Sequence, residues 1–340
     1  MTVSPARASS PSGDSDLRRR HGRGWPRSHP FPIEVWIGVG LLAAYAVVGV
    51  SAIVVFGSSL SRVPTTQMWV PPYPAPPSPS WSHPFGVLSG VGTGLFTAIW
   101  RATPWDLAIV FSILSIDGAL ALVLGSIAGM TPRGWVDRTV TFVSDSIGSV
   151  PPVMLLVVLL LGLSVVARTT VNLPIFVLLF GLLLWPPAAR GVRSRARRAA
   201  QTEYVEASRA SGARESRILV RHVFPASIGP VLAQIPVDVA AIFLMLSAFT
   251  WIANCVNPAD FFATTAAYPL PTLPPITPLP SVYFPEWGNL LGIGMCWGLN
   301  TTAGPDFWWM YTFPLLAIVG LGIALALLCD GLDRWLRVAE

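Results

Sequence analysis

Residues 203–225 read Glu203-Tyr-Val-Glu-Ala-Ser-Arg-Ala-Ser-Gly212-Ala-Arg-Glu-Ser-Arg-Ile-Leu-Val-Arg-His222-Val-Phe-Pro225, a polar stretch between two long apolar segments. The run from Glu203 to Ser211 favours a helix, and Gly212 can adopt a left-handed turn at little cost. A second helix-forming run follows, and Pro225 is expected to end it. The stretch therefore predicts a helix, a turn and a second helix between the two apolar segments.

The second predicted helix has two different faces. Arg214, Arg217 and Arg221 follow one stripe, since residues three and four apart are neighbours on a helix. The apolar face is expected to consist of Leu219, Val220, Val223 and Phe224. One face can therefore pack against the protein while the other meets a partner.

The composition of the whole chain points to lipid. Of its 340 residues, 53% are hydrophobic and only 11% are charged, against about 25% charged residues in soluble domains. All 22 basic residues are Arg, so the phosphate-binding loop of an ATPase, which needs a Lys, is excluded. If ATP drives this protein, another chain must hydrolyse it, and we expect no enzyme activity here.

The few His and Cys residues give no sign of a metal site. Four His and three Cys are present, and no two stand at a metal-binding spacing such as Cys-x-x-Cys. We therefore expect no metal, no cofactor and no disulfide framework.

Apolar segments long enough to cross a bilayer predict six transmembrane helices and an all-α polytopic membrane protein. Prolines in the third and fourth predict kinks or breaks. The six segments are Ile33–Gly57, Trp105–Met130, Thr139–Val166, Pro174–Ala189, Ile228–Ile252 and Trp309–Cys329.

The segments between and around the spans complete the predicted organisation. Residues 1–32 are rich in Arg, Ser and Pro and predict a disordered tail. Residues 58–104 form a proline-rich external loop, and residues 105–335 form a core of five helices. Within that core, 190–227 is a cytoplasmic loop and 253–308 an external proline-rich insertion, whose Trp287 we expect at the membrane interface.

The Arg residues predict the orientation of the chain. With a cytoplasmic N-terminus, 19 of the 22 lie in the tail, the 131–138 turn, the 190–227 segment and the C-terminus. Because positive residues accumulate in cytoplasmic loops, both termini are expected in the cytoplasm.

Several short motifs resemble the permeases of binding-protein-dependent ABC importers. The cytoplasmic signature of that family, Glu-Ala-Ala followed by a Gly and later a Leu-Pro pair, is matched here by Glu206-Ala-Ser, Gly212 and Phe224-Pro. Other matches, in the family's order, are His83-Pro-Phe-Gly, Gly134-Trp-Val-Asp, Asp145 with Pro151, Trp287-Gly and Asp330-Gly-Leu. The likeness covers residues 83–335 and is greatest to the second permease subunit of the dipeptide, oligopeptide and nickel importers.

This resemblance implies a type I ABC importer permease bundle in the bacterial cytoplasmic membrane. It implies a second homologous permease, two ABC ATPase subunits and an extracytoplasmic substrate-binding protein as partners, with no role for nucleic acid. The loop of 190–227 would couple the ATPase to the membrane helices through Glu203, Glu206, Ala207, Gly212, Arg217, Arg221, His222 and Pro225. The external stretch 87–94 and the end of the fifth span differ from the family, so substrate specificity or docking of the binding protein can differ here. The transported solute is left open, because the resemblance implies that selectivity lies largely in the external binding protein.

Three acidic residues fall within the predicted spans. Asp117, Asp145 and Asp238 are candidates to line a translocation path, because an intramembrane carboxylate usually faces a bundle interior or water. The alternative is that they make structural hydrogen bonds between helices. The spans themselves contain no basic partner for them, which argues against an ion-pair relay.

Two other functions are compatible with the sequence. One is a stand-alone transporter or channel driven by ions. Such a protein is expected to contain paired intramembrane charges and inverted repeats. The other is a degenerate subunit kept as a scaffold, which the altered external stretches would allow.

Overall fold

The computed structural model describes residues 31–57, 77–87, 94–151, 154–155, 159, 173–255, 286–298 and 307–339. Within these ranges the regular structure is helical, apart from one isolated antiparallel bridge between Val87 and Gly94. The predicted all-α class is thereby confirmed. Nearly all of the predicted tail 1–32 and much of the segments 58–104 and 253–308 lie outside the described residues.

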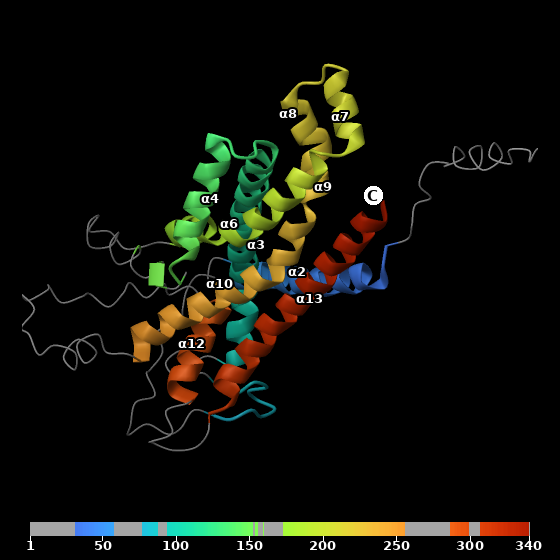
Figure 1. The fold of residues 1–340 in the computed structure, drawn as a ribbon. Coiled ribbons are helices and arrows are strands. Elements are labelled where there is room, and N and C mark those ends of the chain that lie inside the picture. Colours follow the sequence, from blue (N-terminus) through green and yellow to red (C-terminus); the bar gives the residue numbers. More distant parts are fainter. Residues whose placement is uncertain are drawn as a thin grey trace, which may run out of the picture.

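Five of the described helices are long and apolar enough to cross a membrane, which makes this a multi-pass membrane protein. They correspond to the first, second, fourth, fifth and sixth predicted spans. The third predicted span, Thr139–Val166, is described at residues 139–151, 154–155 and 159, and its first part belongs to the short helix α4, Trp135–Gly148. The five long helices are α2 (Ile33–Phe56), α3 (Leu95–Met130), α6 (Leu173–Ala199), α10 (Gly229–Cys255) and α13 (Trp309–Ala339) (Figure 1).

Helices α3 and α6 are longer than their predicted spans. Helix α3 begins ten residues before Trp105, and α6 runs through Pro186 and Pro187. The two helices approach closely through glycines: a Cβ at Gly125 would lie 2.7 Å from the Ala189 carbonyl oxygen. Because neighbouring helices stabilise a proline-containing helix in a membrane, this packing explains why α6 continues past its prolines.

The bundle has two distinct ends (Figure 1). Helices α7 (Glu203–Ala210) and α8 (Glu215–Ile218) project at one end, and α12 (Trp287–Gly298) lies at the other. The start of α2 and the end of α13 are neighbours, since Arg334 Nη1 donates to Glu34 Oε1 at 2.8 Å. The two outermost described segments of the chain therefore meet on the same side of the bundle.

Helix α12 was not predicted, because its sequence lies beside a proline-dense stretch. Trp287 is fully buried rather than placed at the membrane interface, and its indole N–H donates to the Ile99 carbonyl at 3.1 Å. Its backbone N–H lies 3.1 Å from both carboxylate oxygens of Asp106, while Glu286 accepts from the Gly288 N–H at 2.9 Å. Two buried carboxyl groups thus satisfy the free N–H groups at the start of α12.

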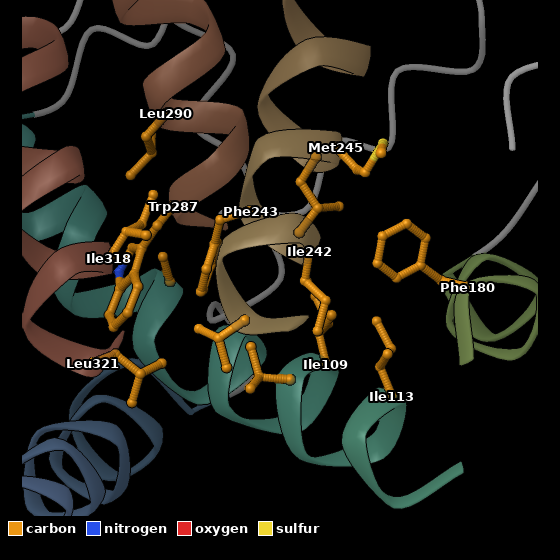
Figure 2. Packing of buried hydrophobic residues seen from close by; sticks show 14 of the residues in the cluster. Ile109, Ile113, Phe180, Ile242, Phe243, Met245, Trp287, Leu290, Ile318 and Leu321 are labelled. Atoms are coloured by element: carbon orange, nitrogen blue, oxygen red, sulfur yellow. The ribbon is translucent and has the colours of Figure 1, made fainter. Parts of the chain in front are cut away.

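Figure 2 shows the main core, in which large apolar side chains from five helices meet. Phe243 of α10 stacks on Trp287 at 5.9 Å between ring centroids. Residues far apart in sequence therefore form the centre of the bundle, which anchors α12 to α3, α10 and α13. The labelled residues are Ile109, Ile113, Phe180, Ile242, Phe243, Met245, Trp287, Leu290, Ile318 and Leu321.

Candidate functional site

The first limb of the candidate site, meaning the helical segment before the Gly212 turn, is α7, which packs on the end of α6. Glu203 and Glu206 stand in its first turn, where negative charge interacts favourably with the helix dipole. Val205 is fully buried in a small apolar cluster with Ala196 of α6. The side chains of Glu203, Glu206 and Ala207 remain exposed. Helix α7 therefore buries one residue for attachment and presents its opposite face outward.

The turn after α7 depends on Gly212, as predicted. Its φ is +81°, a left-handed conformation that L side chains rarely adopt. The Gly212 N–H donates to the Arg209 carbonyl at 2.9 Å and the Ala213 N–H donates to the Ser208 carbonyl at 3.1 Å. These two bonds form a Schellman cap, so the end of α7 is closed by the backbone itself.

An ion pair across the turn fixes the two limbs relative to each other. Arg209 donates to both carboxylate oxygens of Glu215, at 2.6 and 3.2 Å. The hydrogen bond from Arg209 holds the pKa of Glu215 below its usual range, and the same bond raises the pKa of Arg209. Arg209 stands three residues after Glu206 on α7, but it pairs with Glu215 across the turn. Glu206 has no recorded ion pair among the described residues, so its carboxylate is available at the surface.

The second limb is one continuous helical segment with a change of geometry in its middle. Helix α8 passes into a π-helical turn, Leu219–Val223, and then into α9, Phe224–Ser227. Pro225 therefore does not end the helix, contrary to the prediction. A proline ring disturbs the hydrogen bond to the preceding turn, and the wider π-turn just before it provides room for that disturbance.

The faces of this limb differ in part from the prediction. Ile218 and Val223 are fully buried, whereas Val220 is 62% exposed, so the expected apolar role of Val220 is wrong. The π-turn changes the angular step between residues and thereby displaces Val220 from the buried face. Arg214, Arg217 and Arg221 are all exposed.

We call residues 203–227 the α7–α9 unit. Of its predicted site residues, seven are exposed and His222 is half-buried, with its ring 5.5 Å from that of Tyr204. The structure thus brings the predicted residues together on one projecting unit, although they do not converge into a single pocket. The exposed seven are Glu203, Glu206, Ala207, Gly212, Arg217, Arg221 and Pro225.

Asp137 anchors the base of this region, and the sequence analysis did not select it as a site residue. Its carboxylate accepts from the Arg193 Nε, from Arg197 at 3.3 Å and from the backbone N–H of Arg133 at 3.0 Å. The Arg193 hydrogen bond is the main reason that the pKa of Asp137 lies below its usual range. Arg133 has a φ of +63°, and its bond to Asp137 helps to hold that conformation. The Gly134-Trp-Val-Asp137 motif was the one sequence feature that could have pointed to Asp137.

The three intramembrane carboxylates do not form one group. Asp117 of α3 and Asp238 of α10 are each 2% exposed, and they are close enough for their carboxyl groups to interact. Gln234 also donates to Asp238 at 3.0 Å. Asp145 lies elsewhere: it is exposed and 3.8 Å from Arg190. Arg190 lies one residue beyond the predicted fourth span, in the part of α6 that extends past its predicted end, so the absence of basic residues within the spans did not cover this contact.

Metal-ligating side chains do not gather in the described part of the chain, where no group of three or more His, Cys, Asp or Glu could hold an ion. The main feature of the candidate site is structural: the α7–α9 unit, held by a backbone cap and an ion pair, projects from the end of long apolar helices.

Comparison with known proteins agrees with this geometry. Residues 121–338 match the family described as "Binding-protein-dependent transport system inner membrane component". The chain belongs to this family, and it is a membrane permease subunit of an ABC importer.

Individual relatives are of similar size but distant sequence. A protein of Brucella ovis, provisionally named a peptide permease protein, is 26% identical over 257 residues, which cover 75% of this chain and 72% of the relative. The glutathione transport system permease protein GsiD of Pectobacterium atrosepticum is 26% identical over 255 residues, covering 75% and 72%. A provisionally named peptide transport system permease protein of Brucella suis biovar 1 is 26% identical over 254 residues, covering 75% and 73%.

Proposed function

We propose that this permease carries short peptides or a similar small solute across the bacterial cytoplasmic membrane, and that the α7–α9 unit couples it to a separate ATPase. The observation that carries the proposal is the form of the unit: it projects from the bundle, yet Val205, Ile218 and Val223 attach it to α6. A force applied to its outer face is therefore transmitted to a membrane helix. The names of the relatives support a peptide-like solute.

The proposed partners follow from the same reasoning. A second homologous permease completes the translocation path, and two ABC ATPase subunits bind beneath the pair, one of them at the exposed face of α7. An extracytoplasmic binding protein delivers the solute. ATP hydrolysis belongs to the partner chains, since this chain has no Lys for a phosphate-binding loop.

Both termini are assigned to the cytoplasm. The Arg distribution supports this side. The contact between Glu34 and Arg334 supports a common side for the two ends, because it joins the beginning of the first long helix to the end of the last.

Asp117 and Asp238 are proposed to form a polar site within the translocation path. They are buried together between α3 and α10, and each has one carboxylate oxygen without a hydrogen-bond partner. Such a pair can bind a polar group of a passing solute once the helices move apart. Asp145 would contribute from a separate, exposed position beside Arg190.

The experiment compares Glu206→Ala with the wild-type chain in a reconstituted complex of permeases, ATPases and binding protein. Because Glu206 is exposed and unpaired in the described structure, its loss should leave the bundle folded while solute uptake falls relative to ATP hydrolysis. Ser216→Ala is the control, since Ser216 is also exposed on the unit but belongs to its second limb. Unchanged coupling in Glu206→Ala would contradict this role for α7.

The same preparation separates the alternatives. Liposomes that contain this chain alone should show no uptake. Uptake driven by an ion gradient in those liposomes would establish a stand-alone transporter, to which the Asp117–Asp238 pair would then belong. Absence of uptake in the complete complex, with intact ATPase binding, would indicate a scaffold subunit.

A further inference from the structure

A second feature of the α7–α9 unit is a basic cavity whose lining does not include Arg209 or Glu215. Its volume is about 740 Å³, and it lies where α6, α9 and the end of α13 meet α7. Arg195, Arg198 and Arg221 line it together with His222 and Tyr204. Pro225 and Leu336 contribute apolar surface.

The cavity has a strong excess of positive charge. Its lining contains three guanidinium groups and no carboxylate. Arg195 has an acid close by, because a Cβ on Gly229 would touch both Asp333 Oδ1 and Arg195 Nη1. Arg198 and Arg221 are exposed, and neither has a recorded ion pair within the described ranges. Two guanidinium groups are thus free to bind an anion at one site.

The position of the cavity indicates where the anion comes from. Its walls include the last turn of one apolar helix, Pro174–Ala199, and the end of another, Trp309–Leu336. These helix ends lie at the level of lipid headgroups when the helices cross a bilayer. Basic pockets between transmembrane helices on the cytoplasmic side are suited to anionic headgroups, and Arg matches the geometry of a phosphate.

We infer that this cavity binds the phosphate headgroup of an anionic phospholipid from the cytoplasmic leaflet. Arg198 and Arg221 hold the phosphate, and Pro225 and Leu336 contact the apolar part of the lipid next to the headgroup. Since Tyr204 and His222 belong to the α7–α9 unit and their rings lie together at this wall, the lipid also supports the orientation of that unit. The effect on coupling rests on the proposed function, and the choice of the cytoplasmic leaflet rests on the proposed orientation, whereas lipid binding itself rests on neither.

The test measures lipid binding directly, without uptake. The purified permease complex in mild detergent is titrated with a fluorescent phosphatidylglycerol, and phosphatidylcholine serves as the neutral lipid. The variant Arg198→Gln/Arg221→Gln removes two charges from the cavity. At about 1 kcal/mol per basic residue, it should bind phosphatidylglycerol about 30-fold more weakly, and Arg198→Gln alone about fivefold more weakly.

The matched control is Arg138→Gln/Arg214→Gln, which removes the same charge from exposed positions that neither line the cavity nor belong to the predicted coupling residues. It should bind phosphatidylglycerol like the wild type. An equal loss in both double variants would overturn the site, because it would show only general attraction between charges. Equal binding of phosphatidylcholine would overturn it in the same way.

Two further outcomes identify a different ligand. Displacement of phosphatidylglycerol by low millimolar inorganic phosphate would assign the cavity to a soluble anion instead of a lipid. If the cavity variant kept its lipid affinity but lost the ATPase subunits during purification, the cavity would receive an acidic segment of the ATPase. Each variant is first checked for unchanged helix content and a single species in size-exclusion chromatography.

Discussion

Substitution of Gly212 tests whether the shape of the α7–α9 unit, rather than its charge alone, binds the ATPase. A Cβ at Gly212 would meet no atom within 4 Å, so Gly212→Val creates no steric clash with the rest of the protein. The cost comes from the φ of +81°, which a β-branched residue tolerates poorly.

The size of the effect can be estimated from the cap. Left-handed backbone costs an L residue about 1–2 kcal/mol. If the backbone of the Gly212→Val variant relaxes to negative φ instead, the two capping hydrogen bonds are lost, each worth about 0.5–1.5 kcal/mol. Either way the native turn is disfavoured by about 1–3 kcal/mol, which lowers its population relative to other turn conformations by roughly 5- to 150-fold.

We therefore expect Gly212→Val to weaken or abolish ATPase binding while the membrane bundle remains folded. The assay is co-purification of the ATPase subunits with the permease, followed by solute-stimulated ATP hydrolysis in the reconstituted complex. Gly212→Asn is the matched control, because Asn is the side chain that best tolerates left-handed backbone. Full ATPase binding and transport by Gly212→Val would refute the reasoning, and the unit would then serve only to hold the topology.

Two other predictions concern the parts of the bundle that carry the unit. Gly125→Leu should prevent close packing of α3 on α6 and reduce the yield of folded protein several-fold, whereas Gly322→Ala, where a Cβ meets nothing within 4 Å, should have little effect in the same fluorescence-detected chromatography. Asp137→Asn should lower the melting temperature at pH 7 by roughly 2–6 °C, because it removes charge-assisted hydrogen bonds to Arg193 and Arg197. Since the pKa of folded Asp137 is lowered, its stabilisation is present above the ordinary carboxyl pKa and is lost as the pH falls, so the difference between variant and wild type should shrink in acid and a constant difference would contradict this role.

The sequence alone was sufficient for the features that depend on neighbouring residues. Long apolar segments must satisfy their backbone hydrogen bonds internally in lipid, so the helical class and five of the spans could be predicted from length and composition. The turn at Gly212 was likewise predictable, because left-handed backbone selects glycine locally. The family motifs then marked the candidate coupling residues.

Contacts between distant residues decided the rest. Helix α12 forms where Asp106 of α3 satisfies the start of a segment that follows a proline-dense stretch, 181 residues further along the chain. Arg209 pairs with Glu215 instead of Glu206, and Asp117 lies beside Asp238 but not beside Asp145. Helical periodicity shows which residues share a face of a helix, but it does not determine which helices pack against each other. That choice follows from close packing, in which small residues such as Gly125 let backbones approach and thereby determine which polar groups are buried together.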